Sequence, residues 1–175
     1  MKWLIDLPLK FIILNGMVDI RKLPLFSELT KREIDEVLPL FGRKLLSEGE
    51  ALFLEGDSGD RFYIVEKGSI SICIEIEGVG VEELALFENG DFFGEMSLID
   101  DAPRSASAIA RKKSTLLYLD KKDFLYLIER SPSIANKILK AMVLEFCQRL
   151  RESNDRLKDY YLMSKAFTSV DVDEC

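Results

Sequence analysis

The alternation of hydrophobic and polar residues predicts helices at both ends of the chain and short strands between them. Near the start, Thr30 and Glu33 have the spacing of a capping box, in which each side chain bonds the other residue's backbone N–H. Apolar residues then follow at helical spacing, at Ile34, Val37, Leu38 and Phe41. We therefore expect an N-terminal helix that begins after Thr30.

From Lys44 to Leu119 the apolar period shortens, and glycines interrupt the chain at short intervals. One run has the alternation of a half-buried strand, with Ile70, Ile72, Ile74 and Ile76 interleaved with Ser71, Cys73, Glu75 and Glu77. Many short strands separated by turns predict a sandwich or jelly roll.

Two helices are predicted after the strands. Asp120 has the position of an N-cap for a short helix that contains Phe124, and Ser131 followed by Pro132 marks the start of a long one. Residues of the long helix recur at alternating four- and three-residue steps, at Leu139, Val143, Phe146, Leu150, Ser153, Leu157 and Tyr160. Such a heptad seam favours a parallel homodimer. The alternative is that the stripe packs on the protein's own sheet.

Composition narrows the choice of function. A chain of 175 residues with 47% hydrophobic and 31% charged residues fits one globular domain. The formal net charge of −7 disfavours nucleic acid as a partner, because phosphate neutralisation needs clustered Lys and Arg. There is no histidine, and Cys73, Cys147 and Cys175 lack metal-type spacing. We expect no metal, no cofactor, and reduced thiols in a cytoplasmic protein.

The N-terminal segment from Trp3 to Leu14 is apolar but is interrupted by Asp6, Pro8 and Lys10. It has neither the length of a transmembrane span nor a signal-peptide cleavage site. We interpret residues 1–22 as an apolar extension that packs either on the domain itself or on a partner protein.

The candidate chemistry lies in the run FGEMSLIDDAPRSASAIA, where Gly94-Glu95 precedes Arg104 by ten residues. Glycine allows positive φ and a close approach of backbone to a ligand. Residues 96–99 are long enough for one helical turn, whose free N–H groups would point at an anion. Arg104 adds a bidentate cationic contact suited to phosphate oxygens. Glu95 would repel a phosphate, so we expect it to accept a hydrogen bond from a sugar hydroxyl.

This run resembles the phosphate-binding cassette of the cyclic nucleotide-binding domain family, through Phe93, Gly94, Glu95, Met96, Ser97, Leu98, Pro103, Arg104, Ser105 and Ala106. In that family the glutamate holds the ribose 2′-hydroxyl and the arginine holds the cyclic phosphate. The resemblance is to the ligand domains of bacterial cyclic-AMP receptor proteins and of cyclic-AMP-dependent protein kinase regulatory subunits. It extends over Leu23 to Lys158 and includes the runs Gly56-Asp57, Gly59-Asp60 and Tyr63 to Gly68.

The resemblance implies a fold and a domain organisation. It implies an α+β, mainly β protein, in which a double-stranded β-roll is combined with an N-terminal helical segment, a short cassette helix, and C-terminal hinge and lid helices. We assign residues 1–22 to the extension, 23–165 to the nucleotide-binding domain and 166–175 to an acidic, disordered tail. Within the domain, the β-roll covers about residues 44–119, and the hinge and long helix cover about 121–163.

The resemblance also implies a function, that of a non-enzymatic sensor. Ser153 and Asn154 would reach the nucleotide base, Leu98 and Phe124 would relay movement to the hinge, and an unidentified effector protein would receive the signal. Ser105 favours cyclic AMP over cyclic GMP, whereas Asp155 could pair with guanine unless it faces solvent. Two alternatives stay open: a dimeric scaffold that has lost its ligand, and an enzyme built on Glu95, Asp100 and Asp101.

Overall fold

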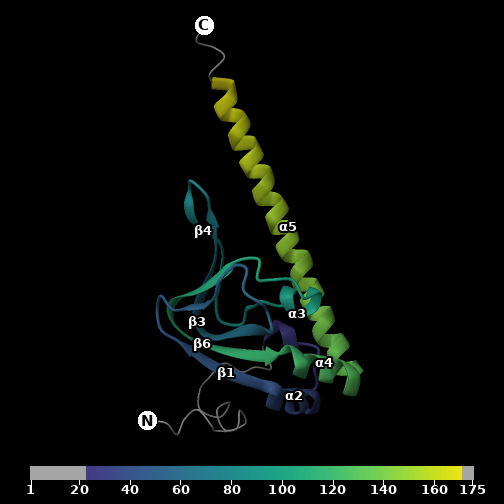
Figure 1. The fold of residues 1–175 in the computed structure, drawn as a ribbon. Coiled ribbons are helices and arrows are strands. Elements are labelled where there is room, and N and C mark those ends of the chain that lie inside the picture. The colour runs from purple at the N-terminus through teal and green to yellow at the C-terminus, as the bar shows by residue number, and fades with distance from the viewer. Residues whose placement is uncertain (1–22, 171–175) are drawn as a thin grey trace.

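The computed structural model describes the backbone of residues 23–170 and the side chains of residues 23–165. The predictions made for the extension at 1–22 and for Cys175 lie outside the described residues. The described part is a curled antiparallel sheet with helices gathered at one end, and one long helix runs past the sheet (Figure 1).

The strands form one antiparallel sheet with the order β1-β6-β3-β4, to which β2 adds by pairing with β6 and β5 by pairing with β3. Their bounds are β1 Phe41–Leu46, β2 Ala51–Phe53, β3 Arg61–Ile76, β4 Gly80–Phe87, β5 Phe92–Phe93 and β6 Ser107–Asp120. The two longest strands, β3 and β6, pair along most of their length, from Arg61 opposite Asp120 to Cys73 opposite Ser107. The predicted mainly β, jelly-roll-like fold is confirmed, with its first strand at Phe41 rather than at Lys44.

The N-terminal helical segment consists of η3 (Pro24–Phe26), α2 (Lys31–Val37) and η4 (Leu38–Leu40). The capping box is present: Thr30 N–H donates to Glu33 Oε2 over 2.7 Å, and Glu33 N–H donates to Thr30 Oγ1 over 3.3 Å. The helix does not extend to Phe41, although its spacing had predicted this; Phe41 is the first residue of β1. Pro39 contributes to the difference, because it has no N–H to continue the α-helical hydrogen bonds; Leu38 keeps helical dihedral angles, and residues 38–40 form the 3-10 turn η4.

The alternation predicted for residues 70–77 holds only in part. Ile70 is fully buried, but Ser71 and Cys73 are buried as well, and Ile76 is 39% exposed. The Ser71 hydroxyl bonds the Glu83 carboxylate on β4, and the β3–β4 pairing shifts register between Ile72 and Cys73. A side-chain contact between strands and an irregularity in the pairing therefore accompany the burial of Ser71 and Cys73, which the alternation assigned to solvent.

Two helices follow the sheet, α4 (Lys121–Arg130) and α5 (Pro132–Val170). Both helices begin where they were predicted, with Asp120 at the N-cap of α4 and Pro132 as the first residue of α5, but neither Asp120 nor Ser131 makes the expected side-chain capping bond. The Asp120 carboxylate makes no capping bond and pairs with Arg61 instead, whereas the Ser131 hydroxyl donates to Glu36 on α2. Each capping side chain has a charged partner from a distant segment, and local sequence does not show it.

The apolar packing of α5 on the domain is confined to its first turns, with the buried residues Ile134, Ala135, Ile138 and Met142. The later seam positions Val143, Leu150, Leu157 and Tyr160 are 56–70% exposed. The helix continues through Val170, so its last turns extend into the segment 166–175 that was predicted as a tail. None of the helices in the described residues has the length and apolar character needed to cross a membrane.

Two clusters of buried residues form the core. One joins the helical segments to the sheet and includes Phe26, Phe62, Leu98, Phe124 and Ile138. The other fills the inside of the roll and includes Tyr63, Val65, Ile70, Phe93 and Leu116. The loop before β6 and the short helix α3 (Met96–Asp100) lie where these two clusters meet, and that position sets the place of the site.

Candidate functional site

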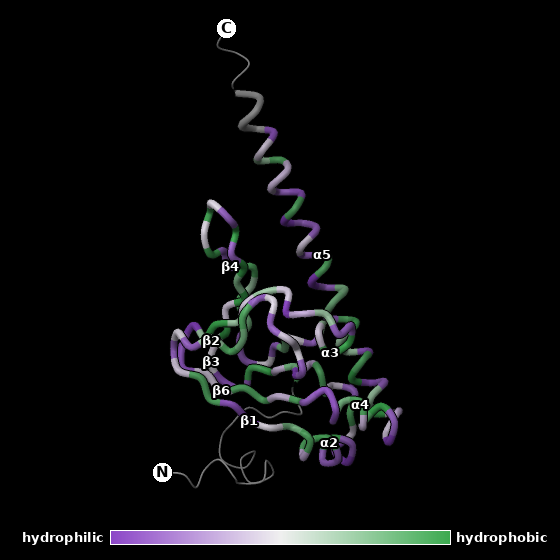
Figure 2. Tube along the Cα trace, viewed as in Figure 1, coloured by the Kyte–Doolittle hydropathy of each residue, from purple (hydrophilic) through white to green (hydrophobic). Residues whose placement is uncertain are grey.

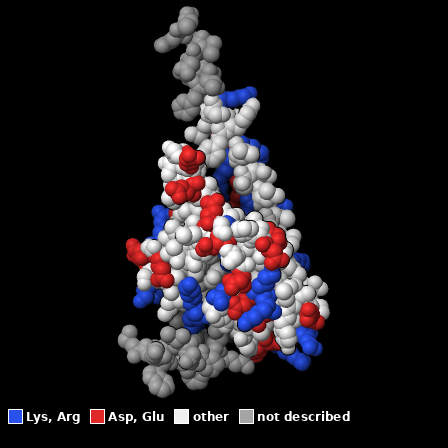
Figure 3. Space-filling view, in the orientation of Figure 1, with Lys and Arg blue, Asp and Glu red and all other residues white. Residues whose placement is uncertain are grey.

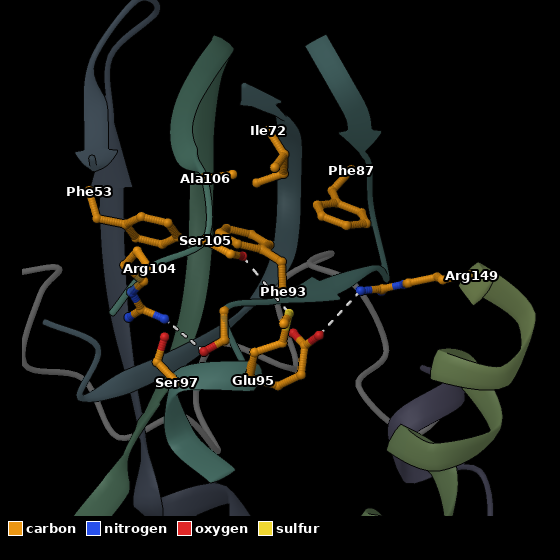
Figure 4. A pocket seen from close by; sticks show the side chains of 12 residues that line it. Phe53, Ile72, Phe87, Phe93, Glu95, Ser97, Arg104, Ser105, Ala106 and Arg149 are labelled. Carbon is orange, nitrogen blue, oxygen red and sulfur yellow. Dashed lines mark hydrogen bonds and ion pairs between the residues drawn. The ribbon is translucent and has the colours of Figure 1, made fainter. Parts of the chain in front are cut away.

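A small cavity lies between the open end of the roll and α5 (Figure 4). Its volume is about 130 Å³. Its walls combine the segment around α3 and the loop before β6 with side chains from β2, β3, β4 and α5. The residues that line it are Phe53, Ile72, Phe87, Phe93, Gly94, Glu95, Met96, Ser97, Arg104, Ser105, Ala106 and Arg149.

The backbone at Gly94 brings the cassette close to Arg104. Gly94 has φ +77°, and a Cβ atom there would lie 2.8 Å from Arg104 Nη1. A side chain at this position would be strained and would push the guanidinium away. A second close approach occurs at Gly59, where a Cβ atom would lie 2.2 Å from the Cβ of Ser97. Gly94 therefore allows the cassette to approach Arg104, and Gly59 allows the loop between β2 and β3 to approach α3.

Arg104 is 4% exposed and is held by backbone carbonyls. Its Nη1 donates to Gly94 O over 2.7 Å and its Nη2 donates to Arg61 O over 2.8 Å. The guanidinium carbon lies 4.2 Å from the centre of the Phe53 ring, a cation–π contact. Nε is buried and has no hydrogen-bond partner. Burial lowers the pKa of Arg104, although a guanidinium in a protein stays charged. The residue is a buried cation with donors to spare.

Glu95 is the corresponding buried anion, with 3% exposure. Its Oε1 lies 3.5 Å from Arg149 Nη1, and its Oε2 has no hydrogen-bond partner. Desolvation raises the pKa of Glu95, while the charges of Arg149 and Arg104 act in the opposite direction. A carboxylate with one free buried oxygen is ready to accept a hydrogen bond from a ligand.

Arg149 connects α5 with the cavity. Its Nη2 donates to Phe92 O over 2.6 Å, and its Nε bonds Glu145 Oε1 over 3.0 Å. Its guanidinium carbon lies 4.6 Å from the Phe87 ring centre and 5.0 Å from that of Phe92. Through Glu95 and Phe92, this single side chain attaches α5 to the start of the cassette.

The structure brings most of the predicted site residues together. Phe93, Gly94, Glu95, Met96, Ser97, Arg104, Ser105 and Ala106 all line the cavity. The Ser105 hydroxyl faces Met96, with 3.9 Å between Oγ and Sδ. Ser153 and Asn154 are exposed on α5 and do not line the cavity, so their contact with a ligand stays a prediction. Leu98 and Phe124 are buried in one core cluster, the arrangement that a relay between cassette and hinge requires.

Four residues of the cavity were not predicted as site residues. Phe53, Ile72 and Phe87 come from three different strands, and no local motif contains them. Arg149 was available as a signal, because it stands in the run Arg149-Leu150-x-x-Ser153-Asn154 that supported the base contacts. Its pairing with Glu95 needs the fold and cannot be obtained from the run itself.

The acidic residues after Glu95 do not form a cluster with it. Asp100 Oδ1 accepts from the backbone N–H of Ala102 over 3.0 Å, a local turn contact. Asp101 ends α3 in a left-handed conformation with φ 60°, and its carboxylate pairs with Lys121. Among the described residues, no group of histidine, cysteine, aspartate and glutamate side chains has the geometry of a metal site.

The cavity therefore offers a buried cation, a buried carboxylate oxygen and several aromatic rings. A matching ligand carries an anionic group, a hydroxyl donor and a flat apolar part. A phosphate on Arg104 would also meet the backbone of the adjoining cassette.

Comparison with known proteins identifies the fold family. Residues 43–131 match the family model described as cyclic nucleotide-binding domain. A cyclic AMP receptor protein of Thermus thermophilus is 38% identical over 131 residues, which are 75% of this chain and 59% of that protein. A cAMP-dependent protein kinase regulatory subunit of Colletotrichum orbiculare is 33% identical over 109 residues, 62% of this chain and 27% of that protein.

Solved structures agree with this result. The catabolite activator protein of Thermus thermophilus aligns with TM-score 0.69 and 36% identity, over 79% of this chain and 63% of that one. A cyclic nucleotide-binding domain from Methylobacillus flagellatus aligns with TM-score 0.74 and 28% identity, over 81% and 79%. The chain spans about three fifths or less of the length of the two curated relatives described above. It belongs to the cyclic nucleotide-binding domain family.

Proposed function

We propose that this protein is a regulatory module that binds a cyclic nucleotide, with cyclic AMP preferred to cyclic GMP. The observation that carries the proposal is that two buried polar atoms of residues lining one cavity, Arg104 Nε and Glu95 Oε2, have no hydrogen-bond partner. A cyclic phosphate supplies the anion that the first lacks, and a ribose hydroxyl supplies the donor that the second lacks. The names of the relatives, which include a cyclic AMP receptor protein, agree with this ligand class.

The electrostatics of Arg104 support an anionic ligand. A buried charge is costly unless it is paired and hydrogen-bonded. The carbonyls of Gly94 and Arg61 satisfy part of the guanidinium, but none of the ion pairs among the described side chains includes Arg104. Asp57, Asp60 and Glu95 act on Arg104 only from a distance, whereas a bound phosphate would supply a counter-charge in direct contact with the guanidinium.

The size of the cavity supports a movement of α5. Sites for small ligands usually measure about 300–1,000 Å³, more than the 130 Å³ found here. A neighbouring hollow of about 530 Å³ lies between β4 and α5 and shares Phe87 and Arg149 with the cavity. If Arg149 and α5 shifted, the two spaces would join and accept the base. Ligand occupancy would then be transmitted through α5 to a separate effector protein.

The preference for cyclic AMP rests on the resemblance of Ser105 to the serine of bacterial cyclic-AMP receptor proteins and on the exposure of Asp155. The Ser105 hydroxyl lies beside the proposed phosphate position and serves either base. Guanine selection through Asp155 is disfavoured, because its side chain is 70% exposed and bonds Lys158 over 2.7 Å. Asp155→Ala is therefore expected to leave both affinities unchanged, and a selective loss of cyclic GMP binding would contradict this assignment.

We also propose that two chains associate through α5. The seam positions Val143, Leu150, Leu157 and Tyr160 are apolar and exposed, and hydrophobic segments recur along the projecting helix (Figure 2). In a parallel pair, Ser153 and Asn154 would stand at the seam, from where they could reach the base in the partner's cavity.

The surface charge does not favour nucleic acid as a further partner. On the face drawn in Figure 3, acidic and basic side chains are interspersed and form no continuous basic surface.

The competing function is a dimeric scaffold of the same fold that binds no nucleotide. The two functions differ in one measurement, calorimetric titration of refolded, nucleotide-free protein with cyclic AMP and with cyclic GMP. We expect micromolar or tighter binding that Arg104→Ala abolishes and Arg111→Ala retains, because Arg111 lies on the outer face and pairs with Glu83. No heat with either nucleotide, from folded protein, would overturn the sensor and favour the scaffold.

A further inference from the structure

We propose that Arg61 is a positioning residue that connects Arg104 to the start of α4. The proposal rests on the proposed function, since it takes Arg104 as the phosphate-binding residue. Arg61 is the first residue of β3, opposite Asp120 at the end of β6. It therefore stands between the cassette and the junction from which α4 begins.

On the cassette side, the contact is made by the backbone of Arg61. Its carbonyl accepts the hydrogen bond from Arg104 Nη2 over 2.8 Å. A phosphate that draws the guanidinium toward itself would compete for this donor and weaken the bond. The position of the Arg61 backbone thus depends on where Arg104 points.

On the helix side, the contact is made by the side chain. Arg61 Nε donates to Asp120 Oδ1, and its guanidinium carbon lies 4.7 Å from the Tyr118 ring centre. The hydrogen bond to Asp120 raises the pKa of Arg61. Asp120 stands at the N-cap of α4 but makes no side-chain capping bond. The carboxylate that would otherwise stabilise the first turn of α4 is instead bound to Arg61.

Two further contacts converge on the same point. Lys121 N–H donates to Asp60 O over 2.8 Å, and Lys121 Nζ pairs with Asp101 at the end of α3. The first turn of α4 is therefore attached to the cassette at Asp101 and, through residues 60 and 61, at Arg104. A shift of Arg104 would reach α4 by a polar route that is separate from the apolar contact expected between Leu98 and Phe124.

The test is hydrogen exchange of the backbone amides in α4, measured by mass spectrometry on the full chain. Arg104→Gln, Arg61→Gln and the double variant form a cycle, and Arg111→Gln is the control because its ion pair with Glu83 does not involve α4. Arg61→Gln removes the side chain but keeps the carbonyl that Arg104 contacts. We expect Arg104→Gln to speed exchange in α4 about threefold, the scale of one partly exposed ion pair. In the Arg61→Gln background, adding Arg104→Gln should speed exchange by less than half as much as it does in the unmodified chain. Some effect should persist because the bond between Lys121 N–H and Asp60 O remains.

Each outcome decides the proposal separately from the proposed function. Additive effects of the two substitutions would overturn the connection, even if cyclic AMP binds normally. A strong dependence of the Arg104 effect on Arg61 would support it, even if no nucleotide binds and the proposed function fails. If Arg104→Gln lowers helix content by circular dichroism, Arg104→Met, which also removes the donor to the Arg61 carbonyl, replaces it in the same cycle. If Arg111→Gln changes exchange in α4 as much as Arg61→Gln does, the proposal is also overturned.

Discussion

Replacing Arg104 by lysine should weaken cyclic nucleotide binding by about two orders of magnitude, and the hydrogen-bond donors at the site give the reason. A guanidinium has five N–H donors and a lysine ammonium has three. Arg104 uses two donors for the carbonyls of Gly94 and Arg61, which leaves three for a phosphate. A lysine that kept both carbonyl bonds would have one donor left. The substitution preserves the charge and removes two donors from the ligand.

Each hydrogen bond that involves a charged group contributes about 1.5–3 kcal/mol. Two lost bonds at the lower value amount to about 3 kcal/mol, or about 150-fold in affinity. If the lysine gave up a carbonyl bond instead, the unsatisfied carbonyl would cost a similar amount, about 1–3 kcal/mol. Both arrangements predict a loss of at least about tenfold.

The assay is isothermal titration of the full chain with cyclic AMP at fixed ionic strength, beside Arg111→Lys as the matched exposed control. The control should bind within about twofold of the unmodified chain, because exposed ion pairs contribute little. A loss of less than threefold in Arg104→Lys, from protein that is folded, would refute the donor argument. The phosphate would then be bound through charge alone or at another place.

Three further predictions follow from residues of the same cavity and helix. Because burial raises the pKa of Glu95 above its ordinary value of 4.5, the ligand-free protein keeps this carboxyl protonated to a higher pH than an exposed glutamate. The affinity for cyclic AMP should therefore rise with pH until Glu95 has ionised. Glu95→Gln should make the titrated Kd independent of pH in that window. Phe53→Leu should weaken cyclic AMP binding about two- to fivefold by removing the ring on which Arg104 stacks, and Phe53→Tyr should restore it in the same titration. Leu150→Glu combined with Leu157→Glu should yield monomers in light scattering without change in the thermal midpoint of a dilute sample, whereas a persistent dimer would exclude the α5 seam as the contact.

The contrast between the two halves of the site shows what sequence can predict here. Gly94, Glu95 and Arg104 were predictable because backbone conformation and nearby contacts within the cassette bring them together. Phe53, Phe87 and Arg149 were not, because β2, β4 and α5 meet only after the sheet has curled.

The same limit applies to the helix caps. Thr30 and Glu33 are three residues apart and form the expected box. Asp120 and Ser131 have charged partners 59 and 95 residues away, Arg61 and Glu36. The local preference of a side chain for helix capping is overridden where a charged residue from elsewhere in the fold bonds that side chain.

The length of α5 beyond the domain makes it a lever. Apolar packing on the core ends near Met142, Arg149 and Arg156 make further polar contacts with the domain, and the helix continues to Val170. The 28 residues from 143 to 170 span about 42 Å at 1.5 Å per residue. If Arg149 and Arg156 gave up these contacts, a rotation of about 10° at Met142 would carry the far end through about 7 Å. A shift of about 2 Å at Arg149, which lies about 10 Å along the helix from Met142, would in this way become a displacement larger than one helical turn at the place where another protein could detect it.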